Sequence, residues 1–158
     1  MNTGKNRKKV LIVGRMPQAG IDLLKTRDDV DFEILTDDSV PALHPKLKDA
    51  NVEHGKQLFQ QQCFTCHTVD KGGANKAGPN QWNLVGRKKA SEAGFSYSSA
   101  LQAKGGDWTY EDINHMIFKP QGYVRGTKMA FAGLVKEQDR ADVIAYLRTM
   151  SDSPAPLP

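Results

Sequence analysis

Cys63-Phe64-Thr65-Cys66-His67 is the stretch that decides how this sequence folds, because it holds the only two cysteines and a histidine directly after the second. Each thiol of such a C-x-x-C-H box can add to one vinyl group of a haem, and the adjacent histidine can bind the iron as an axial ligand. The motif therefore predicts one covalently attached c-type haem.

Three other interpretations of the two cysteines stay open at this point. A zinc site needs a second ligand pair at matching spacing, and the scattered His44, His54 and His115 do not supply one. A redox-active thiol pair would follow a strand in a β-α-β unit, whereas the residues before Cys63 have helical periodicity. A short motif can also arise by chance.

A second axial ligand is expected downstream, and Met129 is the candidate. It lies in a glycine-rich loop, residues 125–133, between two predicted helices. A thioether is a soft, neutral ligand that raises the reduction potential of haem iron. Methionine is also a common filler of hydrophobic cores, which is our interpretation of Met116 and Met150.

Around the motif the hydrophobic pattern predicts mostly helices. One helix begins at Val52, carries Gly55 and Phe59 on one face, and leads into Cys63. An irregular loop is expected over residues 69–90. Three further helices are expected over residues 96–103, 110–118 and 136–150, and a disordered proline-rich tail over 151–158.

The first fifty residues have a different pattern. Residues 8–14 and 30–35 have the character of strands and residues 18–26 that of a helix, which predicts a short β-α-β extension. Residues 37–45 are rich in turn formers and are predicted to be a linker. Two strands and one helix cannot bury both faces of a sheet by themselves, so we expect no independent function here.

Composition argues against several classes of protein. The chain has 158 residues, a formal charge of +4 and a pI of 9.1, but no dense basic stripe with interleaved aromatics of the kind that binds nucleic acid. No stretch approaches the ~20 apolar residues of a membrane-spanning helix. The basic residues at 5–9 precede an apolar run that is too short for a signal peptide, so we recognise no export signal.

Residues 50 to about 150 resemble a class I cytochrome c of the mitochondrial and bacterial c2 type. Gly55, Phe59 and Tyr146 match the contacts between the first and last helices of that family. The resemblance implies the cytochrome c fold, mostly α-helical around one covalent haem. It divides the chain into the extension (1–49), a cytochrome domain (50–150) and the tail (151–158).

The resemblance also implies roles for individual residues. Cys63 and Cys66 would carry the haem covalently. His67 and Met129 would ligate its iron, and the carbonyl of Pro79 would accept a hydrogen bond from His67. Four further residues would bind the haem, three near its propionates and one in the methionine loop: Arg87, Tyr97, Trp108 and Thr127.

The sequence departs from the family pattern near the haem. Met116 and Leu101 stand where many members carry a tyrosine and a buried asparagine, and Lys119 and Arg125 replace an asparagine and a proline. Fewer polar groups around a haem change both its potential and its water organisation.

The resemblance implies an electron carrier between redox proteins rather than an enzyme. Filled axial positions leave no open site, so no small-molecule substrate is expected. The composition already argues against a nucleic acid as partner. Lys76, Lys128 and Lys136 fall at positions that ring the haem edge in the family, where they could steer docking onto acidic partners. The alternative is a haem peroxidase or gas sensor, in which Met129 leaves the iron. We expect the bacterial periplasm, or the mitochondrial intermembrane space, because thioether attachment takes place there in this family.

Residues 8–38 resemble the N-terminus of a D-2-hydroxyacid dehydrogenase of the phosphoglycerate dehydrogenase kind, through residues 9–13, 20–25 and 30–37. The chain has no G-x-G-x-x-G, so no dinucleotide site is predicted. A two-domain dehydrogenase that passes electrons to its own haem is a further hypothesis, and the missing nucleotide and catalytic motifs argue against it.

Overall fold

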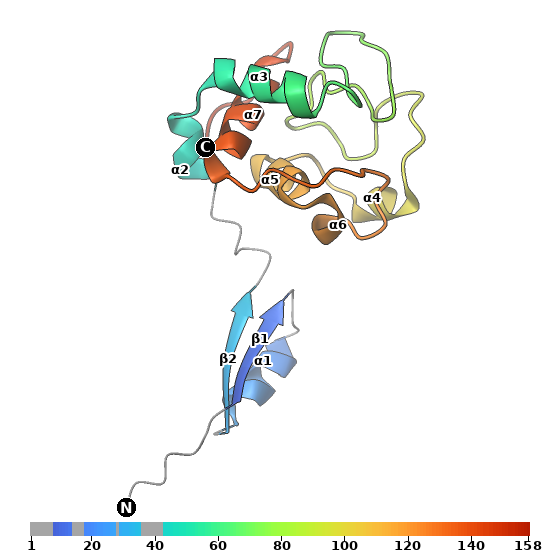
Figure 1. Cartoon of the computed structure of the whole chain (residues 1–158). Helices are drawn as coiled ribbons and strands as arrows, with labels where there is room; N and C mark the ends of the chain where they lie inside the picture. The colour runs from blue at the N-terminus through green and yellow to red at the C-terminus, as the bar shows by residue number, and fades with distance from the viewer. Residues whose placement is uncertain (1–7, 14–17, 28, 36–42) are drawn as a thin grey trace, which may run out of the picture. The chain divides into compact units, whose positions relative to one another are not determined.

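The computed structural model describes residues 8–13, 18–27, 29–35 and 43–158, and the chain divides into two compact units, Met1–Pro41 and Ala42–Pro158 (Figure 1). Both described strands lie in the first unit, and every described helix except one lies in the second. The cysteine motif therefore belongs to the helical unit.

In the N-terminal unit two strands pair in parallel. β1 (Lys8–Val13) runs beside β2 (Val30–Leu35), with Lys8 opposite Val30 and Val13 opposite Leu35. Parallel neighbours need a crossover connection, and α1 (Gln18–Lys25) lies in it.

The C-terminal unit contains six described helices, and a long irregular segment loops out beside them between α3 and α4 (Figure 1). They are α2 (His44–Lys48), α3 (Val52–Gln62), α4 (Ser99–Lys104), α5 (Tyr110–Phe118), α6 (Pro120–Tyr123) and α7 (Glu137–Thr149). Residues 63–98 between α3 and α4 contain neither helix nor strand. No helix in the part of the chain that the structure describes is long and apolar enough to cross a membrane.

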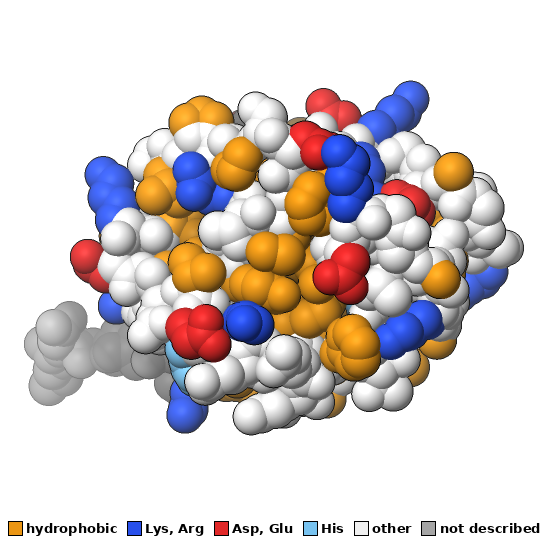
Figure 2. Space-filling view, turned by 90° about the horizontal axis from the view of Figure 1, so that it is seen from above, with side chains coloured by type: hydrophobic (Ala, Val, Ile, Leu, Met, Phe, Trp, Pro, Cys, Tyr) orange, Lys and Arg blue, Asp and Glu red, His pale blue; other side chains and the backbone are white. Residues whose placement is uncertain are grey.

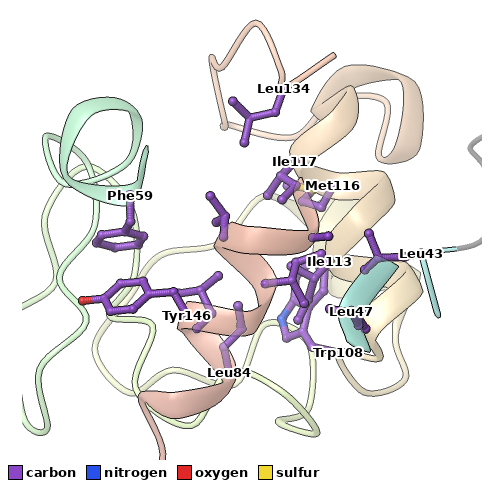
Figure 3. Packing of buried hydrophobic residues seen from close by; sticks show 14 of the residues in the cluster. Leu43, Leu47, Phe59, Leu84, Trp108, Ile113, Met116, Ile117, Leu134 and Tyr146 are labelled. Carbon is purple, nitrogen blue, oxygen red and sulfur yellow. The ribbon is translucent and has the colours of Figure 1, made fainter. Parts of the chain in front are cut away.

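The crossing of α3 and α7 organises the core of this unit. Gly55 is the point of closest approach, because a Cβ atom on it would lie 1.9 Å from the carbonyl oxygen of Asp142. One turn further along, the rings of Phe59 and Tyr146 pack at an interplanar angle of 58° with their centroids 5.7 Å apart (Figure 3). The absence of a side chain at Gly55 is thus what brings this aromatic pair into contact.

Side chains fix where two of the predicted helices, α3 and α5, begin. The Asn51 side chain accepts a hydrogen bond from the backbone nitrogen of His54 and caps α3. Thr109 and Asp112 form a reciprocal capping box at the start of α5. Each cap satisfies backbone donors that the first turn leaves unpaired.

The predicted linker was wrong at His44 and Pro45, which begin α2. Proline is tolerated in a first helical turn because its missing N–H would be unpaired there anyway. Leu43 and Leu47 are 0% and 2% exposed, so this short helix belongs to the core of the C-terminal unit. Residues 37–42 of the predicted linker lie outside the described residues.

The prediction of a disordered tail was also wrong. Residues 151–158 are not helical, as expected, but the carbonyl of Ala155 accepts hydrogen bonds from Arg148 Nε (2.6 Å) and from the Tyr110 hydroxyl (3.1 Å). Asp152 accepts bonds from Lys71 and Trp82. Low helical propensity therefore did not imply disorder, since donors on distant segments hold the tail.

Candidate functional site

A mostly apolar cavity of about 370 Å³ lies inside the C-terminal unit. Its size suits a sizeable organic ligand. Every residue of the predicted haem site lines it: Cys63, Cys66, His67, Pro79, Arg87, Tyr97, Trp108, Thr127 and Met129. Among its other lining residues are Phe59, Gln81, Leu101, Met116 and Leu147.

The end of α3 presents the two cysteines. Cys63 terminates the helix with its backbone nitrogen bonded to the Phe59 carbonyl (2.8 Å). The backbone nitrogens of Cys66 and His67 then both bond to the Cys63 carbonyl, at 3.0 and 2.9 Å. This tight turn brings three reactive side chains to one end of the cavity.

Cys63 and Cys66 are not joined in a disulfide. Burial, with a smaller contribution from Cys66, raises the pKa of the Cys63 thiol to about 11. An unmodified Cys63 is therefore protonated near neutral pH and is a poor redox nucleophile. This environment argues against the hypothesis of a redox-active thiol pair.

The orientation of His67 is fixed by the loop that follows it. Its Nδ1 lies 2.7 Å from the carbonyl oxygen of Pro79. A carbonyl can only accept, so Nδ1 carries the proton and Nε2 has the free lone pair. Gln81 Nε2 donates to the same carbonyl at 2.9 Å. Because both nitrogens share this acceptor, Gln81 Nε2 also lies 2.9 Å from His67 Nδ1.

Gly78 makes this arrangement possible. A Cβ atom there would lie 2.2 Å from Cε1 of His67, so any other residue would displace the ring. Burial lowers the pKa of the His67 imidazole. The hydrogen bond to Pro79 acts in the opposite direction, but the positive charges of Arg87 and Lys76 lower the pKa further. The ring is held neutral, which is the form that binds a metal.

Met129 reaches the cavity from the loop between α6 and α7. Thr127 is 9% exposed, and its hydroxyl accepts a hydrogen bond from the backbone nitrogen of Met129 (3.3 Å). Gln121 Nε2 donates to the Thr127 carbonyl at 2.8 Å. Thr127 thus acts on the backbone of the methionine loop, whereas Met116 enters the cavity from α5.

Arg87 places a charged side chain in the otherwise mostly apolar wall of the cavity. Its two terminal nitrogens bond to the Glu92 carboxylate (2.5 Å) and to the carbonyl of Asn80 (2.9 Å). Its Nε is the one buried side-chain nitrogen or oxygen without a hydrogen-bond partner among the residues that the structure describes. An unpaired buried donor is costly, and a carboxylate in the cavity would pair with it.

Tyr97 and Trp108 complete this side of the cavity. The Tyr97 hydroxyl accepts a bond from the backbone nitrogen of Glu92 (3.2 Å), and Trp108 is 8% exposed. An apolar cavity with two thiols, a neutral histidine, a methionine and an unpaired arginine donor fits a haem with its vinyl groups, iron and propionates.

Comparison with known proteins agrees with this geometry. The family model described as Cytochrome c matches residues 52–151. The chain belongs to the cytochrome c family. Membership implies a covalently bound haem c, the iron and electron-transport chemistry of that group, and the mostly helical fold seen here.

Relatives of this cytochrome c come from bacteria and animals. A cytochrome c homolog of Bradyrhizobium diazoefficiens is 46% identical over 113 residues, which cover 71% of this chain and 61% of that protein. One from Rickettsia typhi is 47% identical over 102 residues, covering 65% and 58%. Cytochrome c type-1 of Ascaris suum is 41% identical over 110 residues, covering 70% and 97%. The chain thus spans about six tenths of the length of the two bacterial relatives. The residues with dehydrogenase resemblance lie outside the matched range 52–151.

Sequence reasoning missed two residues that organise this cytochrome c site. Gln81 shares the Pro79 carbonyl with His67, and Glu92 holds Arg87. Neither belongs to a local motif, and both act only because a loop folds back on itself. Their opposite charges, five residues apart in the sequence, were the one feature that could have indicated the pairing of Arg87 and Glu92.

Proposed function

We propose that this chain is a single-haem electron carrier, with thioether bonds to Cys63 and Cys66 and with His67 and Met129 as the two axial ligands. When bound, the haem iron takes up and releases one electron. The observation that carries the proposal is the hydrogen bond from His67 Nδ1 to Pro79 inside the cavity that Met129 also lines. A metal-binding histidine characteristically donates its other N–H in this way.

The remaining residues of the cavity support this function in different ways. Arg87 offers an unpaired donor to a propionate, while Trp108 and Tyr97 exclude water with large aromatic surfaces. Exclusion of water and the soft thioether of Met129 both favour the reduced state of the iron. If His67 and Met129 both hold the iron, they leave no position on the metal for a substrate, which supports a carrier rather than an enzyme.

Two methionines in one cavity allow a matched test of the ligand. Met129→Leu should abolish the red-edge sulfur-to-iron absorption band and lower the reduction potential. Met116→Leu removes a sulfur from the same cavity and should keep the band. Loss of the band in Met116→Leu alone would overturn the assignment of Met129.

Carbon monoxide distinguishes the carrier from the alternative of a peroxidase or gas sensor. The spectrum of the reduced wild-type protein should not change under carbon monoxide, whereas Met129→Leu should bind it. Binding by the wild-type protein would favour a labile Met129. An intact mass of chain plus one haem under denaturing conditions tests the covalent attachment itself.

We propose that acidic redox proteins dock through Lys76, Lys128 and Lys136. The domain from residue 50 to 158 has thirteen Lys and Arg against ten Asp and Glu, and Figure 2 shows a face on which hydrophobic side chains gather among charges of both signs. Docking would therefore depend on individual lysines rather than on a uniform basic field.

Two of these lysines are already held in place. Lys76 Nζ donates to the Phe64 carbonyl (2.6 Å) and lies 3.8 Å from the centre of the Phe64 ring. Lys128 Nζ donates to the Ser96 carbonyl (2.8 Å). Lys128→Gln should reduce the salt dependence of electron transfer to ferricyanide more than Lys119→Gln, an exposed lysine outside this set.

The place of this function in the cell is a further part of the proposal. Thioether attachment in this family is a task of the periplasm or the intermembrane space, and we propose the bacterial periplasm. Cell fractionation that followed the haem-bearing protein would test it, and haem-bearing protein confined to the cytoplasm would contradict it.

A further inference from the structure

A short antiparallel ladder supports one wall of the cavity. The backbone nitrogen of Gly86 donates to the Trp108 carbonyl and that of Trp108 to the Arg87 carbonyl, both at 2.8 Å. Lys88 and Asp107 pair across the ladder between them. Because Arg87 and Trp108 both line the cavity, this ladder determines how their side chains meet a bound haem.

Lys89 closes the ladder with a buried positive charge. Its backbone nitrogen donates to the Gly106 carbonyl (2.8 Å), and its Nζ donates to the Asp107 carbonyl (2.6 Å). The side chain is 5% exposed, and Nζ lies 5.4 Å from the centre of the Trp108 ring. The aromatic neighbour of this ammonium group is thus a residue that also lines the cavity.

Asp112 is the counter-ion of Lys89. Its Oδ2 lies 3.2 Å from Lys89 Nζ, and its carboxylate also accepts hydrogen bonds from Thr109 and Tyr123. Burial alone would raise the pKa of this carboxyl, but the bonds from Thr109, Tyr123 and Lys89 together hold it below its ordinary range. The Asp112 carboxyl is therefore ionised near neutral pH.

We propose that Lys89 is a positioning residue for electron transfer: it clamps the ladder that carries Arg87 and Trp108, and its charge contributes to the reduction potential of the haem. The inference rests on the proposed function. A buried charge is weakly screened, and reduction adds an electron to the haem, so a nearby cation favours the reduced form and a nearby anion the oxidised form.

The two members of the pair should therefore act in opposite directions. Lys89→Met keeps the length of the side chain and leaves Asp112 unbalanced, which lowers the reduction potential. Asp112→Asn keeps one of the two acceptor oxygens that Thr109 and Tyr123 use. It leaves Lys89 unbalanced, which raises the potential. The double variant removes both charges and should lie nearer to the wild-type protein than either single variant.

The experiment is a spectroelectrochemical titration of the four haem-loaded proteins, with Lys88→Met as the control. Lys88 is the exposed neighbour of Lys89, so its loss changes the net charge equally without touching the buried pair. At a fixed solution potential, Lys89→Met should raise the ratio of oxidised to reduced protein by about threefold or more. Lys88→Met should change it by less than half as much.

Each outcome decides the inference. Opposite shifts in Lys89→Met and Asp112→Asn support it. Equal shifts of the reduction potential in Lys89→Met and Lys88→Met would mean that Lys89 acts no differently from an exposed charge, which would overturn the inference. Shifts of the same sign in the two buried-pair variants would indicate disruption of the fold and also overturn it. A wild-type protein without covalent haem would instead refute the proposed function, so the two failures are distinguishable.

Discussion

Replacing Gly55 by alanine would force the two longest helices of the C-terminal unit apart. The new Cβ atom would lie 1.9 Å from the Asp142 carbonyl oxygen, 2.4 Å from its carbon and 2.9 Å from the Val143 nitrogen. All three are backbone atoms, so no side chain can rotate away. Because Cβ contacts below 3.0 Å essentially do not occur, α3 and α7 would have to separate by the difference between 3.0 and 1.9 Å.

The free-energy cost of separating the helices is the sum of three contributions. Overpacking of a tight contact costs about 1–3 kcal/mol, and weakening of the contact between Phe59 and Tyr146 adds about 1 kcal/mol. Alanine returns about 1 kcal/mol through its higher helix propensity. Gly55→Ala should therefore lower the free energy of unfolding by about 2 kcal/mol, measured by guanidinium titration of the haem-loaded protein with far-ultraviolet circular dichroism.

Gly122→Ala is the matched control. The atoms nearest to its Cβ would belong to the flexible side chain of Lys119, at 3.2 Å, so its stability should stay within about 0.5 kcal/mol of the wild-type protein. Equal stabilities for Gly55→Ala and Gly122→Ala would refute the argument that backbone contact at Gly55 sets the helix crossing.

Three further predictions concern buried polar groups and the tail. Arg140→Met removes a guanidinium that is 1% exposed and leaves the buried acceptors of Asn114 and Leu134 without their donor. It should cost about 3 kcal/mol by guanidinium titration, and a stability equal to that of the wild-type protein would contradict this. Because the pKa of Asp112 is held below its ordinary range, its ionised form stabilises the fold above about pH 4 and this contribution is lost on acidification. Asp112→Asn should therefore flatten the fall of unfolding free energy with decreasing pH, and an unchanged slope below about pH 4 would refute the linkage. Deletion of residues 154–158 removes the Ala155 carbonyl, which two side chains of the folded unit bind; the melting temperature should fall, and an unchanged value would mean that the tail contributes nothing.

The helices that lead to the site were predictable because their patterns are local. The periodicity from Val52 and the proline at 120 predicted α3 and α5 close to their observed bounds. The helix predicted over 96–103 is displaced to Ser99–Lys104, because the Ser98 side chain caps it by accepting from Leu101. The four-residue α6 was missed, since so short a helix has no periodicity to detect.

The sequence by itself determined the C-x-x-C-H box, the methionine loop and the helices that frame them, because those features depend on neighbouring residues. Only the tertiary structure decided that α2 and the tail join the C-terminal unit, that Gln81 shares a carbonyl with His67, and that Lys89 pairs with Asp112 beneath Trp108. These contacts join residues that are distant in the chain, or lie on loops without a repeating pattern. Their energies come from burial and from the partners that burial imposes, which a single sequence does not reveal.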